Sequence, residues 1–168
     1  MVRRKWIMVS CVIAVAVAGT VLLLSKGPKA KIRRACKDLA SRVSAVSEGE
    51  GEQKRALKAF GLRKYFAAEC ELALRNFEHN GTYTPKEIAG SVMRMRSRFE
   101  RVEVKLYDLS VTLESAQRAR VHLTARVEVK RSGGQAVRSE ARELLCSVQK
   151  EEGEWKFTRF EEVAVLRK

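Results

Sequence analysis

The stretch LLCSVQKEEGEWKF, residues 144–157, predicts two antiparallel strands joined by a tight turn. Leu144, Cys146 and Val148 recur at every second position, which is the period of a strand with one buried face. A glycine between glutamates then marks a hairpin turn, after which Trp155 is expected to point inward again. This hairpin therefore indicates a sheet with one apolar face.

The chain before this hairpin continues the strand pattern. The alternation of apolar and polar residues is cleanest from Val121 to Val129, which predicts a long strand with one buried face. In the preceding strand the apolar positions change parity near Tyr107 and Asp108, which indicates a bulge or a bend. The second half of the chain is therefore predicted to be an antiparallel meander.

Helices are predicted before the meander. After Pro28, apolar residues recur at steps of four and three as far as Val46, which indicates an amphipathic helix. A second and shorter helical segment is expected to carry Leu57, Phe60 and Phe66 inward.

One more strand and a third helix are predicted between these segments. Residues 70–74 alternate between apolar and polar side chains, as a half-buried strand does. Thr84, Pro85 and Glu87 predict the start of a helix, because a threonine can cap it, a proline fits its first position and a glutamate can bond back to the cap amide.

An apolar run of 19 residues without charge extends from Trp6 to Leu24. A helix of this length, rising 1.5 Å per residue, crosses most of a hydrocarbon core of about 30 Å. We therefore predict a basic tail over residues 1–5, a transmembrane anchor over 6–25, a linker over 26–29 and one folded domain over 30–168. A cleaved signal peptide is the alternative, but apolar residues continue past its small-residue site.

Basic residues flank the predicted anchor on both sides. Those that follow it would keep the domain cytoplasmic under the positive-inside rule, whereas the three that precede it are themselves hard to translocate. The following residues are also candidates for contact with anionic lipid headgroups: Lys26, Lys29, Lys31, Arg33, Arg34 and Lys37.

Charge and cysteine spacing limit the classes of function. Without Arg3, Arg4, Lys5 and Lys26, the chain has 30 basic and 20 acidic residues, a net charge of +10 that favours anionic surfaces. No cysteine pair has zinc-ligand spacing and no phosphate loop is present, so we expect neither a metal nor a cofactor.

Three cysteines, Cys36, Cys70 and Cys146, lie in apolar stripes of the predicted domain. Free cysteine in such surroundings behaves as a small hydrophobe, so we expect buried thiols. A disulfide between Cys70 and Cys146 remains open for a domain in an oxidising compartment.

The order of helices, a strand, a capped helix and a meander ending in Glu-Gly-Glu-Trp-Lys-Phe resembles the nuclear-transport-factor-2-like superfamily, which includes SnoaL-like and ketosteroid-isomerase-like proteins. The resemblance covers about Lys29 to Leu166. It implies an α+β cone-shaped domain of about three helices packed on a strongly bent antiparallel sheet. Members tethered by one amino-terminal helix look like assembly parts outside the cytoplasm, so the resemblance also implies an extracytoplasmic domain.

An isomerase or dehydratase of this superfamily would need an acid or base that projects into an apolar cavity. Four charged residues share the parity of inward-facing neighbours, and two interpretations stay open. They could line a polar cavity mouth, or bulges at residues 144–145 and near Phe160 could turn them outward, which we favour. The candidate pocket residues are these four and two further residues: Glu140, Arg142, Arg159, Glu161, Asp108 and Trp155.

We predict a single-pass membrane protein whose non-catalytic domain binds a protein partner or a small apolar ligand, or serves as a scaffold. One alternative is an isomerase or dehydratase that uses Glu140, Glu161 or Asp108, although no catalytic set can be assigned. Another is electrostatic binding to anionic lipid or nucleic acid. The arginines near residues 94–101 lack interleaved aromatics, which argues against specific nucleic-acid binding. A charged outer sheet face predicts a monomer or a weak homodimer.

Overall fold

The computed structural model describes residues 27–46, 51–74, 80–131 and 137–163. The described elements, in chain order, are α2 (Pro28–Val43), β1 (Ala45–Val46), α3 (Glu52–Phe60), the 3₁₀ turn η1 (Arg63–Tyr65), β2 (Phe66–Ala73), β3 (Gly81–Tyr83), α4 (Pro85–Arg98), β4 (Arg101–Leu113), β5 (Arg118–Lys130), β6 (Arg138–Glu151) and β7 (Glu154–Glu162). The α+β class and the predicted order of elements are confirmed.

The predicted anchor over residues 6–25 lies outside the described residues. Within the described part of the chain, no helix combines the length and the apolar composition that a membrane crossing requires.

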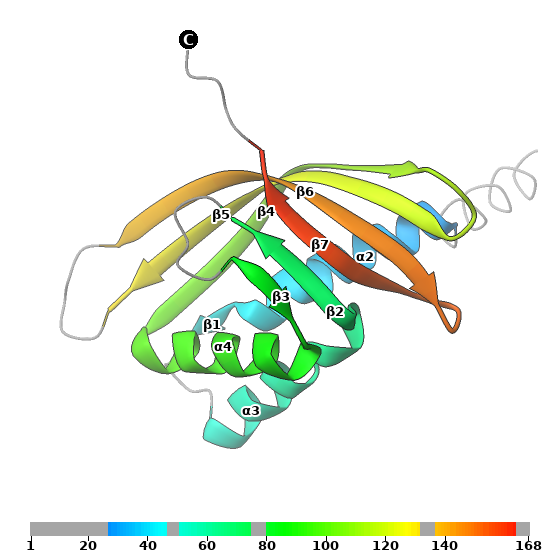
Figure 1. The fold of residues 1–168 in the computed structure, drawn as a ribbon. Coiled ribbons are helices and arrows are strands. Elements are labelled where there is room, and N and C mark those ends of the chain that lie inside the picture. The colour runs from blue at the N-terminus through cyan, green and yellow to red at the C-terminus, as the bar shows by residue number, and fades with distance from the viewer. Residues whose placement is uncertain (1–26, 47–50, 75–79, 132–136, 164–168) are drawn as a thin grey trace, which may run out of the picture.

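Seven strands form one sheet in the order β1-β4-β5-β6-β7-β2-β3. The sheet arches over α2, and α4 and α3 lie beneath the sheet (Figure 1). Every neighbouring pair is antiparallel except β2 and β7, which run parallel. The prediction of a wholly antiparallel sheet is wrong at this boundary. A hairpin turn forces antiparallel pairing, but β2 and β7 are far apart in sequence, so no turn sets their relative direction.

The register of the meander places its apolar side chains on the concave face of the sheet. Val121 of β5 lies opposite Cys146 of β6, which in turn lies opposite Phe160 of β7. Leu123 lies opposite Leu144 in the same way. Opposite residues share a face, so the alternation read from the sequence is the inward stripe of the sheet.

The core fills the space between this concave face and α2. Ile32 and Cys36 of α2 are buried against the sheet, as the helical periodicity predicted. Trp155 and Phe157 are also buried, and the rings of Phe66, Phe157 and Phe160 form a cluster with centroids 5.1–6.4 Å apart. The inward position of Trp155 is thereby confirmed.

The short helix α3 differs from the prediction. Leu57 is 72% exposed and Phe60 is 52% exposed, whereas Ala59 is buried. The helix therefore packs through Ala59 and turns its large apolar side chains outward. The expected inward position is correct for Phe66 and wrong for Leu57 and Phe60.

Two local predictions are confirmed. The Thr84 hydroxyl accepts a hydrogen bond from the Glu87 amide at 3.3 Å, and the Thr84 amide donates to the Glu87 carboxylate at 2.8 Å, which is the capping box at the start of α4. The register of β4 against β5 shifts between Tyr107 and Ser110, and Asp108 has φ 52° at this bulge.

Candidate functional site

The concave face carries a group of charged side chains at the end of the sheet where β6 begins. Arg142 lies opposite Ala125, and Glu140 lies opposite Val127, without interruption of the β5–β6 register. The bulge predicted at residues 144–145 is absent from this described ladder, so Glu140 and Arg142 keep the inward parity of Leu144.

Arg142 joins two carboxylates on this face. Its Nη1 donates to Glu162 Oε2 at 2.6 Å, and its Nη2 donates to the Glu140 carboxylate. The side chains of Arg142 and Glu162 are only 18% and 16% exposed, whereas Glu140 is exposed. Burial alone would lower the pKa of Arg142, but its bonds to the two carboxylates outweigh burial and raise that pKa.

The other predicted pocket residues lie elsewhere. The β6–β7 register shifts next to Ser147, so Arg159 and Glu161 face the outer side of the sheet, as the predicted bulge near Phe160 requires. There Arg159 bonds to Glu71 at 2.6 Å. Asp108 is exposed at the bend of β4, and Trp155 belongs to the core. The six candidates therefore do not form one pocket.

Glu162 was missed by the sequence reasoning. The same bulge explains the omission, because one extra residue in β7 exchanges the two faces for every residue that follows it. Glu162 thus takes the inward position that the uninterrupted alternation assigned to Glu161. A parity change after Phe157, where two consecutive polar residues precede Phe160, is the only trace of this bulge in the sequence.

The interior of the cone is almost wholly uncharged. Among the described residues, Arg96 is the one charged side chain that is buried. Cys36, Cys70 and Cys146 are buried free thiols, and burial raises the pKa of Cys36 and of Cys70 to about 12. These thiols are protonated at neutral pH, so they are poor nucleophiles.

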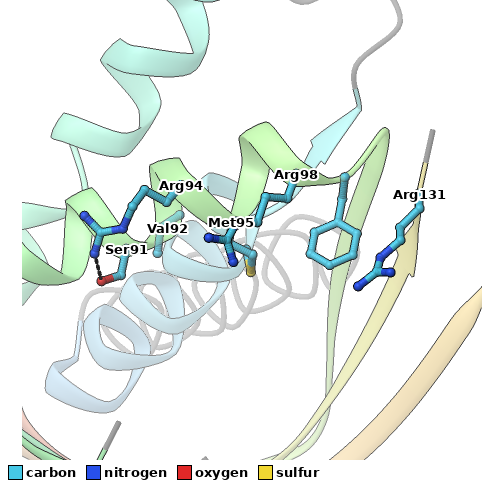
Figure 2. A pocket seen from close by; sticks show the side chains of 7 residues that line it. Ser91, Val92, Arg94, Met95, Arg98 and Arg131 are labelled. Atoms are coloured by element: carbon cyan, nitrogen blue, oxygen red, sulfur yellow. Dashed lines mark hydrogen bonds between the residues drawn. The ribbon is translucent and has the colours of Figure 1, made fainter. Parts of the chain in front are cut away.

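A groove of about 670 Å³ runs along α4 (Figure 2). Side chains at positions 91, 94, 95 and 98 share one helix face because they are three or four residues apart. Phe99 follows the helix, and Arg131 arrives from the end of β5. The groove is lined by Ser91, Val92, Arg94, Met95, Arg98, Phe99 and Arg131.

The charges around this groove have one sign. Arg94, Arg98 and Arg131 are exposed and point along the groove, and none of its described lining residues carries a carboxylate (Figure 2). The Arg131 guanidinium lies 5.8 Å from the centroid of the Phe99 ring, and Arg94 donates to the Ser91 hydroxyl at 2.9 Å. The groove therefore combines cationic walls with an apolar floor.

The sequence had indicated Arg94 and Arg98 as part of a basic cluster, but it had indicated neither Arg131 nor an aromatic residue beside these arginines. Pairing of Arg101 with Lys130 brings the end of β5 beside the start of β4, so Arg131 lies close to Phe99. This contact joins residues that are far apart in sequence, so the spacing of residues within one helix could not predict it. Arg98, in the last turn of α4, also interacts favourably with the helix dipole.

Five of the six predicted membrane-facing cations belong to α2, and the sixth, Lys26, lies outside the described residues. The five are exposed on the helix: Lys29, Lys31, Arg33, Arg34 and Lys37.

No family model and no curated protein matches this chain. Solved structures do match. A protein from Novosphingobium aromaticivorans named as a candidate scytalone dehydratase aligns with a TM-score of 0.62 and 15% identity over 89% of each chain. The dehydrochlorinase LinA-type3 from Novosphingobium barchaimii aligns with a TM-score of 0.60 and 15% identity over 80% of this chain and 84% of its own.

Kfla4162 from Kribbella flavida aligns with a TM-score of 0.65 and 13% identity over 83% of this chain and 91% of its own. The chain has the nuclear-transport-factor-2-like fold. The fold expected from the order of elements is thereby confirmed. Likeness at this level of identity concerns the fold, because the same fold serves unrelated functions.

Two of these neighbours are named as a dehydratase and a dehydrochlorinase. Those names describe the neighbours, and their likeness to this chain is one of fold. What this chain can do therefore depends on where its own acids, bases and cations lie.

Proposed function

We propose that the domain binds a small anionic molecule with an apolar part, and that the α4 groove holds it. The observation that supports this function is the set of three guanidinium groups around Val92, Met95 and Phe99, with no carboxylate among the described lining residues. Guanidinium groups bind carboxylates and phosphates through paired hydrogen bonds. The apolar floor would bury the rest of the ligand.

Binding fits this groove better than catalysis does. Arginine stays protonated in proteins, so Arg94, Arg98 and Arg131 can hold an anion but cannot accept a proton from it. The remaining polar side chain of the lining is Ser91, whose hydroxyl already accepts a hydrogen bond from Arg94. The groove thus offers charge and apolar surface without a general base.

Phenyl phosphate is a suitable probe because it joins an anion to an aromatic ring. We expect the full chain, held in phosphatidylcholine nanodiscs, to bind it about tenfold more tightly than inorganic phosphate or benzyl alcohol in titration calorimetry. Arg94→Gln combined with Arg98→Gln should weaken binding at least about tenfold, since each charge-assisted hydrogen bond contributes roughly 1.5–3 kcal/mol.

A matched double variant removes the same charge elsewhere on the domain. Arg118→Gln with Arg138→Gln changes two exposed arginines at strand ends outside the groove. This variant should bind phenyl phosphate with an affinity within about twofold of the original. Equal losses in both double variants would mean attraction by net charge alone and would refute the groove as the binding site.

An isomerase or dehydratase activity is the second candidate, and the partly buried Arg142–Glu162 pair on the concave face supports it together with the fold comparison. The Glu162 carboxylate would take a proton from a carbon beside a carbonyl, and the Arg142 guanidinium would stabilise the negative charge on the carbonyl oxygen. Glu140 is exposed, so it would lie at the edge of this site.

Glu161 provides the matched control for this activity because it is the next residue and faces the outer side of the sheet. The first step is measured by NMR as the exchange of carbon-bound protons of small cyclic ketones for deuterium from deuterated water. Glu162→Gln should lower the exchange rate at least about a hundredfold, whereas Glu161→Gln should not change it. No exchange above background with the original chain would refute the enzyme.

A further inference from the structure

A second groove, of about 460 Å³, lies beside the first half of α2, where η1 and the start of β7 meet the helix. It is separate from the α4 groove and shares no lining residue with it. Its lining residues are Lys31, Arg34, Ala35, Asp38, Lys64, Tyr65, Glu154, Trp155 and Lys156.

Three elements contribute cations to this groove. Lys31 and Arg34 are three residues apart on one face of α2, Lys64 belongs to η1 and Lys156 belongs to β7. The Lys156 amine donates to the Lys64 carbonyl oxygen, and the Lys64 amine lies 4.9 Å from the centroid of the Tyr65 ring. These contacts hold two ammonium groups at the groove.

Two carboxylates face the same space. The Tyr65 hydroxyl donates to Asp38 Oδ2 at 3.4 Å, which leaves the other oxygen atom of that carboxylate available, and Glu154 lies at the start of β7. A simple anion would use the four cations and be repelled by these carboxylates. A ligand that carries both a phosphate and a primary ammonium group matches all six charged side chains.

The position of the groove in the chain indicates where such a ligand would come from. Three residues separate Leu24, the end of the apolar run, from Pro28 at the start of α2, and an extended segment of that length spans about 10 Å. The amino-terminal end of α2 and the turn between β6 and β7 lie at the same end of the domain (Figure 1). With the predicted anchor in a bilayer, this end would lie beside the lipid headgroups.

We propose that residues 6–25 anchor the chain in a bilayer, as the sequence predicts, and that this groove binds the headgroup of an aminophospholipid of that bilayer. The phosphate lies against Lys31, Arg34, Lys64 and Lys156, and the primary ammonium group donates to Asp38 and Glu154. The domain is thereby fixed in one orientation on the membrane. This proposal depends on the predicted anchor and is independent of the α4 groove.

The choice of lipid separates this proposal from general attraction to a membrane. Phosphatidylethanolamine and phosphatidylcholine carry the same phosphate and the same net charge, but only the first has an ammonium group that can donate hydrogen bonds. The full chain is placed in nanodiscs of either pure phosphatidylcholine or a mixture of the two lipids. Pulsed acetylation with mass spectrometry then gives the modification rate of each lysine.

We expect Lys31, Lys64 and Lys156 to be acetylated about fivefold more slowly in the mixed nanodiscs, because the bound headgroup covers their amines. Lys86 and Lys105, which are exposed on α4 and on the outer sheet face, are the internal controls and should react equally in both. Equal rates at the groove lysines in both lipids, or equal slowing at the controls, would overturn the proposal.

Two further experiments test whether the ligand is a lipid or a free solute and whether Asp38 binds it. Soluble phosphoethanolamine at low concentration, added to phosphatidylcholine nanodiscs, should not reproduce the slower acetylation. If it does, the ligand is a free solute and the proposal fails.

Asp38→Asn should abolish the difference between the two lipids while leaving phenyl phosphate binding unchanged. Asp108→Asn, at an exposed position, should preserve the difference between the two lipids. A lipid difference that survives Asp38→Asn would refute the assigned role of that carboxylate.

Discussion

Arg142 of β6 donates to Glu162 of β7 at 2.6 Å, and both side chains are more than four-fifths buried on the concave face of the sheet. This pair lies where the apolar lining of the cone ends. Removal of one member would leave the other charge partly buried without its partner, so the two residues depend on each other.

We predict that Arg142→Met and Glu162→Gln each lower the free energy of unfolding by about 2 kcal/mol, and that the double variant loses little more than either single one. Urea denaturation of the original chain, the two single variants and the double variant gives the coupling free energy directly. The half-exposed pair of Arg159 and Glu71, 2.6 Å apart on the outer face, is the comparison, with an expected coupling below about 1 kcal/mol. Additive effects at Arg142 and Glu162 would contradict the prediction.

The capping box of α4 predicts a specific dependence on pH. Hydrogen bonds from the backbone and side chain of Thr84 lower the pKa of Glu87. A carboxyl group with a depressed pKa in the folded state stabilises the protein above its unfolded pKa, and this contribution is lost as the pH falls through the folded value. Glu87→Gln should therefore lower the urea midpoint at neutral pH, and the difference from the original chain should vanish in acid.

Thr84→Ala tests the other half of the same cap. The loss of an N-cap hydroxyl costs about 1 kcal/mol, and because this cost does not require an ionised group, most of it should persist in acid. A difference between Glu87→Gln and the original chain that does not change with pH would show that the carboxylate charge is not what stabilises the cap.

The parts of the fold that follow from local pattern could be predicted from the sequence. The alternation around Val121 fixes which side chains of β5 face inward, and Thr84 with Glu87 fixes where α4 begins. Each of these features depends on residues that are close together in sequence. The parity change near Asp108 likewise located the bulge in β4.

The candidate sites were harder to predict because they depend on register and on distant pairing. One extra residue in β7 gave Glu162 rather than Glu161 the inward position. Arg131 reaches Phe99 only through the pairing of β4 with β5, and Lys156 donates to the carbonyl of Lys64, which lies 92 residues earlier in the chain. No local pattern records such contacts.

The bulge at Asp108 predicts an unusual tolerance to glycine. Its φ of 52° is in the left-handed region, which glycine adopts freely, aspartate tolerates and β-branched residues avoid. Asp108→Gly should leave the free energy of unfolding within about 0.5 kcal/mol, whereas Asp108→Val should lower it by roughly 1–2 kcal/mol. Equal stability of the two variants in urea would mean that the left-handed conformation is not maintained in solution.

The thiols of the core should be inaccessible to reagents in the folded protein. Cys36, Cys70 and Cys146 are buried, and burial is the main cause that raises the pKa of each thiol. Because the thiolate is the reactive form, alkylation by iodoacetamide near neutral pH should be at least about a hundredfold slower in the native chain than in urea. Peptide mapping assigns the rate to each cysteine, and a peptide that links Cys70 to Cys146 would contradict the free thiols.

The same pKa shifts predict instability in alkali. A group whose pKa is raised on folding stabilises the protein below its unfolded pKa, near 9.0 for a thiol, and this contribution is lost as the pH rises through the folded value, about 12 for Cys36. The stability advantage of the original chain over Cys36→Ala should therefore be constant up to about pH 9 and shrink between pH 9 and 12. Because the two chains differ only at position 36, the difference between the two urea midpoints isolates the thiol. A difference that stays constant across this range would contradict a thiol pKa that is raised on folding.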